Sequence, residues 1–138
     1  MDYQEQMELI FMRGACCAEA LVRLGLALRG EENEQFALAA AGLCDGMHSG
    51  CLCGALMGGA LLLSMFDRNF AAGTMIPELT EWFDDVYGME YGSMNCEDIT
   101  EGNIHCKAER CRPLMRATGS KCIELLETYG YLKKEKQI

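Results

Sequence analysis

Proline is nearly absent from this sequence, with two residues among 138. Disordered and low-complexity chains are rich in proline, so its scarcity argues against long linkers and against a disordered protein. Half of the residues (50%) are apolar, enough to bury the core of one compact domain. We therefore expect a single domain over residues 1–138, without an internal repeat or a domain linker.

Positive charge is also scarce. Lysine and arginine number 12 against 21 aspartates and glutamates, which gives a net charge of −9. A chain of this charge repels the phosphate backbone of nucleic acids and the anionic surface of membranes. The composition therefore predicts no nucleic-acid partner and no membrane partner.

The sequence has no apolar run of the length that a membrane span needs. Its most apolar segment, residues 52–66, has 15 residues, whereas a spanning helix takes roughly 20. Near the N-terminus, Asp2, Glu5 and Glu8 occupy the region where a secretory signal carries basic and then apolar residues. We expect a buried helix at residues 52–66 and a cytoplasmic protein.

Strand patterns are missing as well. No stretch alternates apolar and polar residues over the length of a strand, and helical spacing recurs instead. The sequence predicts an all-α fold, a single-domain bundle of about six helices. The predicted helices cover residues 3–12, 15–29, 34–41, 52–66, 77 to 88 or 91, and 111–129, with a short turn at 96–98.

Particular residues mark the predicted helix ends. Gly30 stops one helix and Asn33 caps the next, because glycine tolerates left-handed backbone and asparagine accepts hydrogen bonds from free amides. Proline fits the first turn of a helix. Pro77, preceded by a Thr74 cap, and Pro113 are therefore expected to open the last two long helices.

Glycines recur at every fourth position from 42 to 58. Where side chains are missing, another backbone can approach closely. The spacing does not distinguish helix packing from ligand binding, and both interpretations stay open.

Cysteine, in contrast, is abundant, with nine residues. This number is odd, so the cysteines cannot all pair within one chain, and a cytoplasmic protein keeps its thiols reduced. The cysteines are therefore interpreted as reactive groups or metal ligands rather than as structural crosslinks.

Three cysteines lie near predicted helix N-termini: Cys53, Cys96, and Cys111 between Arg110 and Arg112. The free amides and the positive end of the helix dipole favour a thiolate there, which predicts a lowered pKa and a nucleophile. The competing interpretation is that these cysteines are small apolar residues of a helical core.

Three stretches of this sequence together resemble a known family. They are GACCAEA at residues 14–20, CGALMG at 53–58, and YGSMNC at 91–96 followed by Cys111. Their order and spacing are similar to those of the redox-active protein family named for the pattern C_GCAxxG_C_C. The resemblance implies a redox function without an agreed substrate or cofactor. It places the four signature cysteines at Cys17, Cys53, Cys96 and Cys111.

Five further cysteines depart from the family pattern and leave open a second thiol pair or a larger set of ligands. These are Cys16, Cys44, Cys51, Cys106 and Cys122.

The first functional hypothesis is thiol redox chemistry. Cys53 and one of Cys17, Cys96 or Cys111 would alternate between a dithiol and a disulfide, exchanging electrons with a redox partner protein or a small-molecule thiol. A disulfide needs Cα atoms within about 7 Å of each other. No C-x-x-C motif is present, so the pair must form between distant segments.

The second hypothesis is a metal site. Four thiolates suffice for zinc or an iron–sulfur cluster, and Cys17, Cys53, Cys96 and Cys111 would supply them if the helices bring them together. The short C-x2-C spacing of zinc ribbons is missing.

The third hypothesis is a helical binding or assembly module without catalysis, in which the cysteines only fill the core. Ten methionines and the spaced glycines suit an adaptable interface, including that of a homo-oligomer.

Overall fold

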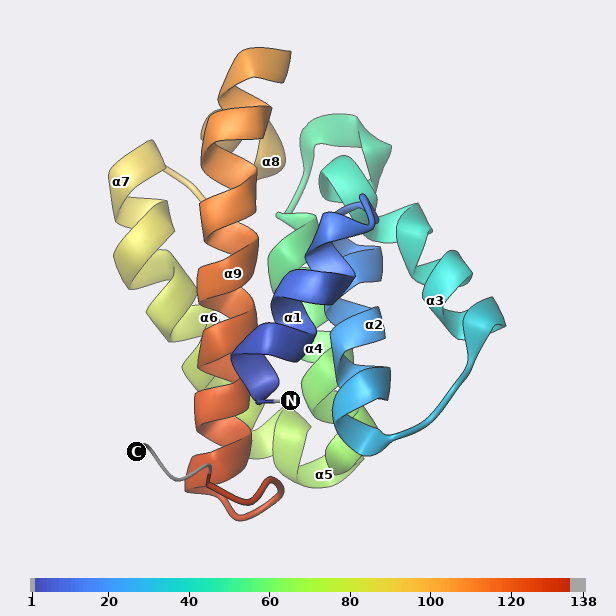
Figure 1. The fold of residues 1–138 in the computed structure, drawn as a ribbon. Coiled ribbons are helices and arrows are strands. Elements are labelled where there is room, and N and C mark those ends of the chain that lie inside the picture. The colour runs from blue at the N-terminus through green and yellow to red at the C-terminus, as the bar shows by residue number, and fades with distance from the viewer. Residues whose placement is uncertain (1, 135–138) are drawn as a thin grey trace.

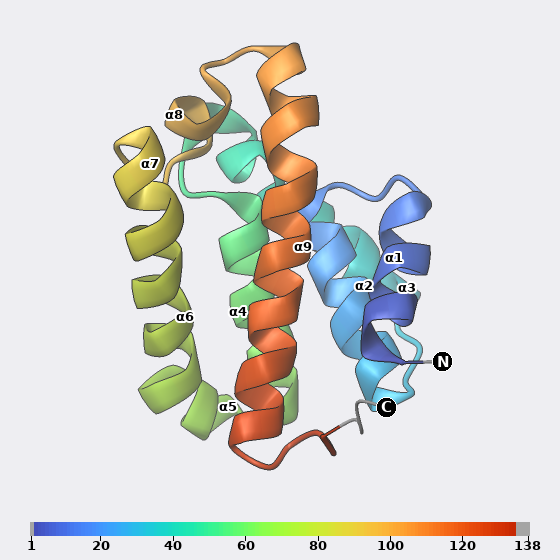
Figure 2. The same cartoon turned by 60° about the vertical axis from the view of Figure 1, so that its left-hand side comes forward.

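The computed structural model describes residues 2–134, in which α4 (Gly54–Phe66) forms the centre of a helical bundle. α2 (Cys17–Arg29), α6 (Ile76–Phe83) and α9 (Ile104–Thr128) pack against α4 (Figures 1 and 2). Within the described residues the only β-type pairing is one isolated antiparallel bridge. The predicted all-α fold is confirmed.

The first two helices follow the predicted boundaries closely. α1 spans Tyr3–Met12, and Asp2 caps it by accepting a hydrogen bond from the amide of Glu5 at 2.7 Å. Gly14 then turns the chain with a φ of +81°, and α2 begins at Cys17, two residues after the predicted start. Gly30 ends α2 in the left-handed conformation, as expected.

α3 (Glu34–Ala40) is a short helix on the outer side of α2. The side chain of Asn33 accepts a hydrogen bond from the amide of Phe36 at 3.1 Å, which confirms the predicted cap. A single turn, Ala41–Leu43, extends α3 toward the segment that leads to α4.

Glycine allows α4 to approach α2 closely. A Cβ atom on Gly58 would lie 2.9 Å from the Cα atom and from the carbonyl oxygen of Ala18, so only glycine fits at this crossing. α4 is largely buried, as predicted for residues 52–66. No helix of residues 2–134 is long and apolar enough to cross a membrane.

The next three helices form one continuous helical rod. α5 (Arg68–Phe70), α6 and α7 (Met89–Tyr91) are joined by the turns Ala71–Met75 and Asp84–Gly88, and the residues at the junctions keep right-handed helical angles. In both turns the backbone hydrogen bonds reach five residues back instead of four.

The predicted start of this rod at Pro77 is wrong. Asp67 caps the rod by accepting from the amides of Asn69 and Phe70, and Thr74 lies inside the helix. Proline has no amide hydrogen to give to the carbonyl one turn earlier. The wide turn directly before Pro77 relaxes the usual hydrogen-bond pattern at that point, so the helix continues through the proline.

Of the last two helices, α8 (Cys96–Thr100) begins where the sequence predicts and α9 begins earlier. α8 follows Asn95, as expected. α9 begins at Ile104 and passes through Pro113, and the side chain of Asn103 caps it by accepting a hydrogen bond from the amide of His105 at 2.8 Å. Cys111 therefore lies two turns inside α9 and not at its N-terminus.

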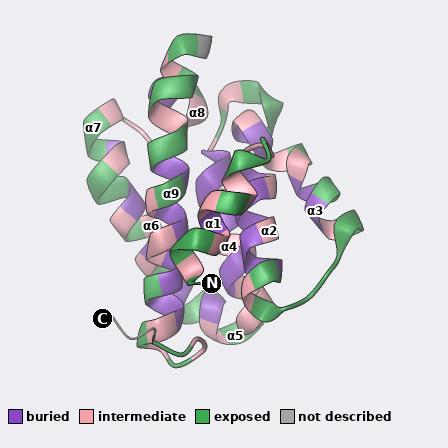
Figure 3. Cartoon of the chain, in the orientation of Figure 1, coloured by how far each residue is buried: buried purple, intermediate pink, exposed green. Residues whose placement is uncertain are grey.

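The buried residues line the inward faces of the central helices (Figure 3). The largest fully buried side chains include Leu21, Leu24, Leu62, Leu79, Phe83 and Leu126. The predicted frayed tail, residues 133–138, lies mostly outside the described residues.

Candidate functional site

Four segments that carry cysteines meet at one end of the bundle, the upper end in Figures 1 and 2. They are the start of α2, the segment between α3 and α4, the turn leading into α8, and the first half of α9. α8 packs against α9 and against the turn Gly46–Gly50, while α4 packs against α2 and α9. Cysteines that are far apart in sequence thereby come to one region.

A short antiparallel pairing fixes the positions of Cys53 and Cys96. The amide of Cys53 donates to the carbonyl of Met94 at 3.0 Å, and the amide of Cys96 donates to the carbonyl of Cys51 at 2.7 Å. These two bonds flank the isolated bridge of the described residues. The N-termini of α4 and α8 are therefore joined directly through the residues that carry their cysteines.

The thiol of Cys17 occupies the space beside Gly54. A Cβ atom on Gly54 would lie 2.5 Å from Cys17 Sγ and 3.2 Å from the Cα atom of Cys44. The first glycine of the CGALMG stretch thus makes room for the thiol at the start of α2. The same geometry places the Cys17 sulfur close to Cys44.

The four signature cysteines influence one another electrostatically. A negative charge on Cys17 raises the pKa of Cys53, of Cys96 and of Cys111, and Cys53 and Cys96 each also interact with Cys111. Such interactions need short separations. The backbone pairing of the segments of Cys53 and Cys96, the Cys17 sulfur beside Gly54, and the cavity lined by both Cys17 and Cys111 agree with this and place the four cysteines in one region. Their catalytic role remains a prediction.

The predicted lowering of the thiol pKa values is wrong. Burial raises the pKa of Cys53 to about 12, although the amides of Leu56 and Ala55 act in the opposite direction. Burial also raises the pKa of Cys111, to about 11, and that of Cys96. Desolvation outweighs the helix N-terminus at Cys53, and Cys111 has no helix N-terminus beside it.

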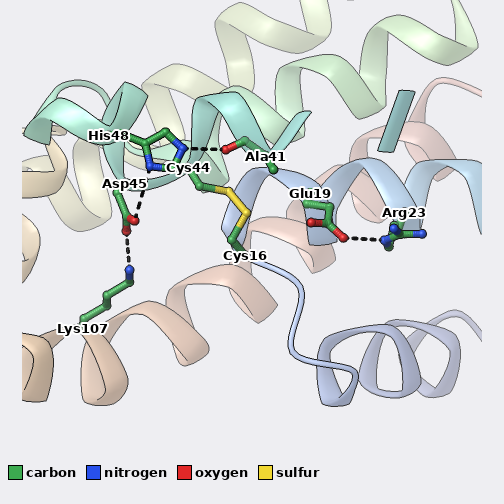
Figure 4. The surroundings of a disulfide bond; sticks show 8 residues. All are labelled: Cys16, Glu19, Arg23, Ala41, Cys44, Asp45, His48 and Lys107. Atoms are coloured by element: carbon green, nitrogen blue, oxygen red, sulfur yellow. Dashed lines mark hydrogen bonds and ion pairs between the residues drawn. A yellow bond between two sulfur atoms is a disulfide. The ribbon is translucent and has the colours of Figure 1, made fainter. Parts of the chain in front are cut away.

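Asp45 and Lys107 form an ion pair (Figure 4). Both residues line a cavity together with Cys17 and Cys111. The lysine charge lowers the pKa of Cys17, Cys96 and Cys111, and the aspartate charge raises each of them. The hydrogen bond to Asp45 in turn raises the pKa of Lys107. The two charges thus oppose each other in their effect on the thiols.

A left-handed turn carries Asp45 to this position. Asp45, Gly46, Met47 and His48 have consecutive φ values between +54° and +62°. Left-handed backbone costs roughly 1–2 kcal/mol for a residue with a side chain, and at Gly46 a Cβ atom would lie 2.2 Å from the carbonyl oxygen of Cys51. The ring of His48 bonds to the carbonyl of Ala41 at 2.9 Å (Figure 4) and secures the turn.

A disulfide joins Cys16 to Cys44 beside the ion pair (Figure 4). The Cα atoms are 6.1 Å apart, and 28 positions separate the two residues in the sequence. The sequence left a second thiol pair open but did not identify this one. No local spacing indicates it, because the packing of α3 and of the turn Ala41–Leu43 against α2 is what returns Cys44 to the start of α2.

A cavity of about 400 Å³ opens between the start of α2 and α9. Cys16, Cys17 and Cys111 line it together, with the ion pair of Asp45 and Lys107 at its edge. A second cavity of about 380 Å³ lies on the other side of the ion pair and is lined by Cys96. An oxidised cysteine and two free thiols therefore face one space of substrate size.

Three cysteines belong neither to the four signature positions nor to the disulfide. Cys122 is fully buried in α9, with its sulfur 3.8 Å from the carbonyl oxygen of Gly59, so it packs as a core residue. Cys51 is exposed, and the partly exposed Cys106 donates to a carboxylate oxygen of Glu101 at 3.6 Å. The interpretation of cysteine as core filler is correct for Cys122.

The described side chains do not form the metal site that the second hypothesis predicts. In the part of the chain that the structure describes, no three His, Cys, Asp or Glu side chains are placed to hold a metal ion. The four signature thiols share a region without forming a common ligand sphere. The residues present therefore do not fit zinc or an iron–sulfur cluster in this conformation.

A family model described as "Putative redox-active protein (C_GCAxxG_C_C)" matches residues 15–127. This span contains all nine cysteines. No curated protein and no solved structure matches the chain.

Proposed function

The chain belongs to the family described as "Putative redox-active protein (C_GCAxxG_C_C)", and on this premise we propose that it transfers electron pairs by thiol–disulfide exchange. The centre of the reaction is the cavity between α2 and α9. One observation carries the proposal: Cys16, already joined to Cys44, lines the same cavity as the free thiols of Cys17 and Cys111.

Reduction of the disulfide begins at Cys16, because Cys16 lines the cavity while Cys44 is buried. A thiolate of the reductant attacks the sulfur of Cys16, the bond to Cys44 breaks, and Cys44 leaves as a thiolate that takes up a proton. A second thiol of the reductant then attacks the mixed disulfide. The reductant leaves as a disulfide, and two electrons and two protons remain on Cys16 and Cys44.

Cys17 links the disulfide to the interior thiols. Cys17 Sγ and the backbone of Cys44 both lie beside Gly54. The Cys17 thiolate attacks the Cys44 sulfur, and Cys16 leaves as a thiolate that takes up a proton. This exchange conserves the number of disulfides and needs no external oxidant. It moves the oxidised bond from Cys16 to Cys17, the thiol whose charge acts on Cys53, Cys96 and Cys111.

Exchange needs a thiolate, and the raised pKa values keep these thiols protonated at neutral pH. The Lys107 ammonium favours the thiolates of Cys17, Cys96 and Cys111. We therefore include Lys107 in the site as a positioning residue. A cytoplasmic location and a redox partner protein or small-molecule thiol complete the proposal.

A redox titration tests this function. The protein is equilibrated in buffers of reduced and oxidised dithiothreitol, the free thiols are alkylated, and the cysteine peptides are mapped by mass spectrometry. We expect the bond between Cys16 and Cys44 to open and close reversibly with the transfer of two electrons, without unfolding. The exposed Cys51 serves as the control and stays alkylated throughout.

The proposal is wrong if Cys16 and Cys44 remain unpaired at every potential. It is equally wrong if their bond is reduced only after the protein unfolds, because the disulfide is then a structural crosslink.

A further inference from the structure

The cavity that holds the thiols continues into a neighbouring cavity of about 290 Å³. The two cavities share Gly14, Ala15, Arg112 and Met115 as lining residues, so they form one groove between the α1–α2 turn and α9. Phe11 lines the far end of this groove. A small molecule can therefore reach the thiols while its remaining atoms contact apolar and cationic side chains.

Three cations and one anion line the groove, and Glu8, which pairs with Arg116, lies outside the lining residues. Lys107 pairs with Asp45, and Arg116 pairs with Glu8 at 2.7 Å. Arg112 is exposed and has no ion-pair partner among the described residues. The two pairs are neutral as units, so Arg112 provides the uncompensated charge of the groove.

The whole chain is acidic, but distance limits the effect of the other charges. The Debye length at physiological ionic strength is about 8 Å, so exposed charges beyond the groove are largely screened. Arg112 directly follows Cys111, whose thiol lines the cavity. An anionic group that contacts Arg112 therefore lies within a short distance of a reactive sulfur.

We propose that this groove binds a small disulfide whose short arms carry carboxylates, or the corresponding thiol. The inference rests on the proposed function and specifies its substrate class. One carboxylate pairs with Arg112, which presents a planar guanidinium suited to a carboxylate. The aliphatic arm lies against Met115 and Phe11, and the sulfur–sulfur bond faces Cys111 and Cys17.

The reaction at the groove balances without a further reagent. The Cys111 thiolate attacks one sulfur of the bound disulfide, a mixed disulfide forms, and the first arm leaves as a thiol after taking up a proton. The Cys17 thiolate then attacks the Cys111 sulfur and releases the second arm as a thiol. Two protein thiols become a disulfide, and the bound disulfide becomes two thiols.

Three disulfides of similar size test the charge preference. They are 3,3′-dithiodipropionate, which is anionic, 2-hydroxyethyl disulfide, which is neutral, and cystamine, which is cationic. Fully reduced protein is mixed with each disulfide, and thiol release is followed in a single turnover. We expect the anionic disulfide to react about fivefold faster than the neutral one at low salt, and added salt to reduce this difference.

The substitution Arg112→Gln isolates the proposed contact. It lowers the rate with 3,3′-dithiodipropionate by about fivefold relative to the rate with 2-hydroxyethyl disulfide. Arg68→Gln is the matched control, because Arg68 is an exposed arginine in α5, away from the groove. Mass spectrometry of the acid-quenched reaction should find the mixed disulfide on Cys111.

Two results would overturn the inference while leaving the proposed function intact. One is equal reaction of the anionic and neutral disulfides, unaffected by Arg112→Gln. The other is a mixed disulfide that forms first on the exposed Cys51. If no disulfide of any charge oxidises the protein, and the bond between Cys16 and Cys44 resists reduction, the proposed function itself fails.

Discussion

At the scale of single residues, the environment of each cysteine decides what its sulfur can do. Cys122 is fully buried and packs in the core, whereas Cys17 and Cys111 are partly exposed and line a cavity. Burial is the largest cause of the raised pKa values of Cys17 and Cys111, and the charges of Asp45 and Lys107 make smaller, opposite contributions. Reactivity at this site is therefore controlled by two charges as well as by burial.

The substitution Asp45→Asn tests this control. It removes the charge that raises the pKa of Cys17 and Cys111 and leaves the Lys107 charge that lowers it. Asparagine tolerates the left-handed conformation of this position, so the turn should persist. We expect both thiols to react about three- to tenfold faster with iodoacetamide at pH 8, measured by peptide mass spectrometry.

The reverse variant, Lys107→Gln, is the control and should slow the same thiols. If both substitutions change the alkylation rates in the same direction, the two charges do not act as described.

At the scale of secondary-structure elements, the sequence predicted the helices better than their starts. Asn33 and Gly30 were identified correctly because caps and stops act through local hydrogen bonds and local φ angles. Pro77 and Pro113 misled the prediction, since both lie inside continuous helical segments, Pro77 directly after a wide turn and Pro113 within α9. The residues that cap these two helices, Asp67 and Asn103, are present in the sequence, but proline is the more conspicuous indicator of a helix start.

The crossing of α2 and α4 at Gly54 allows a prediction of stability. In Gly54→Ala the new Cβ would lie 2.5 Å from Cys17 Sγ and 2.9 Å from the carbonyl oxygen of Leu43. Overpacking of this kind costs about 1–3 kcal/mol. We expect the free energy of unfolding in urea to fall by that amount and the Cys17 alkylation rate to change.

Gly42→Ala is the matched control, because a Cβ atom at Gly42 would have no neighbour within 4 Å. An equal loss of stability in both variants would contradict the close approach at Gly54.

At the scale of the whole molecule, the site is a product of tertiary structure. The four signature cysteines were identifiable from their resemblance to a family, but the bond between Cys16 and Cys44 was not. Residues 28 positions apart meet because α3 and the turn Ala41–Leu43 pack back along α2. Burial by the surrounding helices also reversed the expected direction of the thiol pKa values, which no local pattern could indicate.

These raised pKa values predict how stability depends on pH. The thiols of Cys53 and Cys122 have a pKa of about 12 in the folded chain, against an ordinary value of 9.0. The unfolded chain loses these protons first, so the free energy of unfolding falls as pH rises from about 9 toward 12. Each of the two thiols lowers the free energy of unfolding by up to about 1.4 kcal/mol for each pH unit in this range.

Urea unfolding at several pH values measures this slope. Cys122→Ala should remove one thiol's share of the slope, although the variant is also less stable at neutral pH. A slope that is the same with and without Cys122 would contradict the prediction.

The central claim is that oxidation is directed to the cavity between α2 and α9. The most direct test is to mix fully reduced protein with one equivalent of neutral 2-hydroxyethyl disulfide and to map the products at successive times. The account predicts two equivalents of released thiol and one protein disulfide, formed first among Cys16, Cys17, Cys44 and Cys111. Release of one equivalent, with mixed disulfides left on the more exposed Cys51 and Cys106, would contradict it.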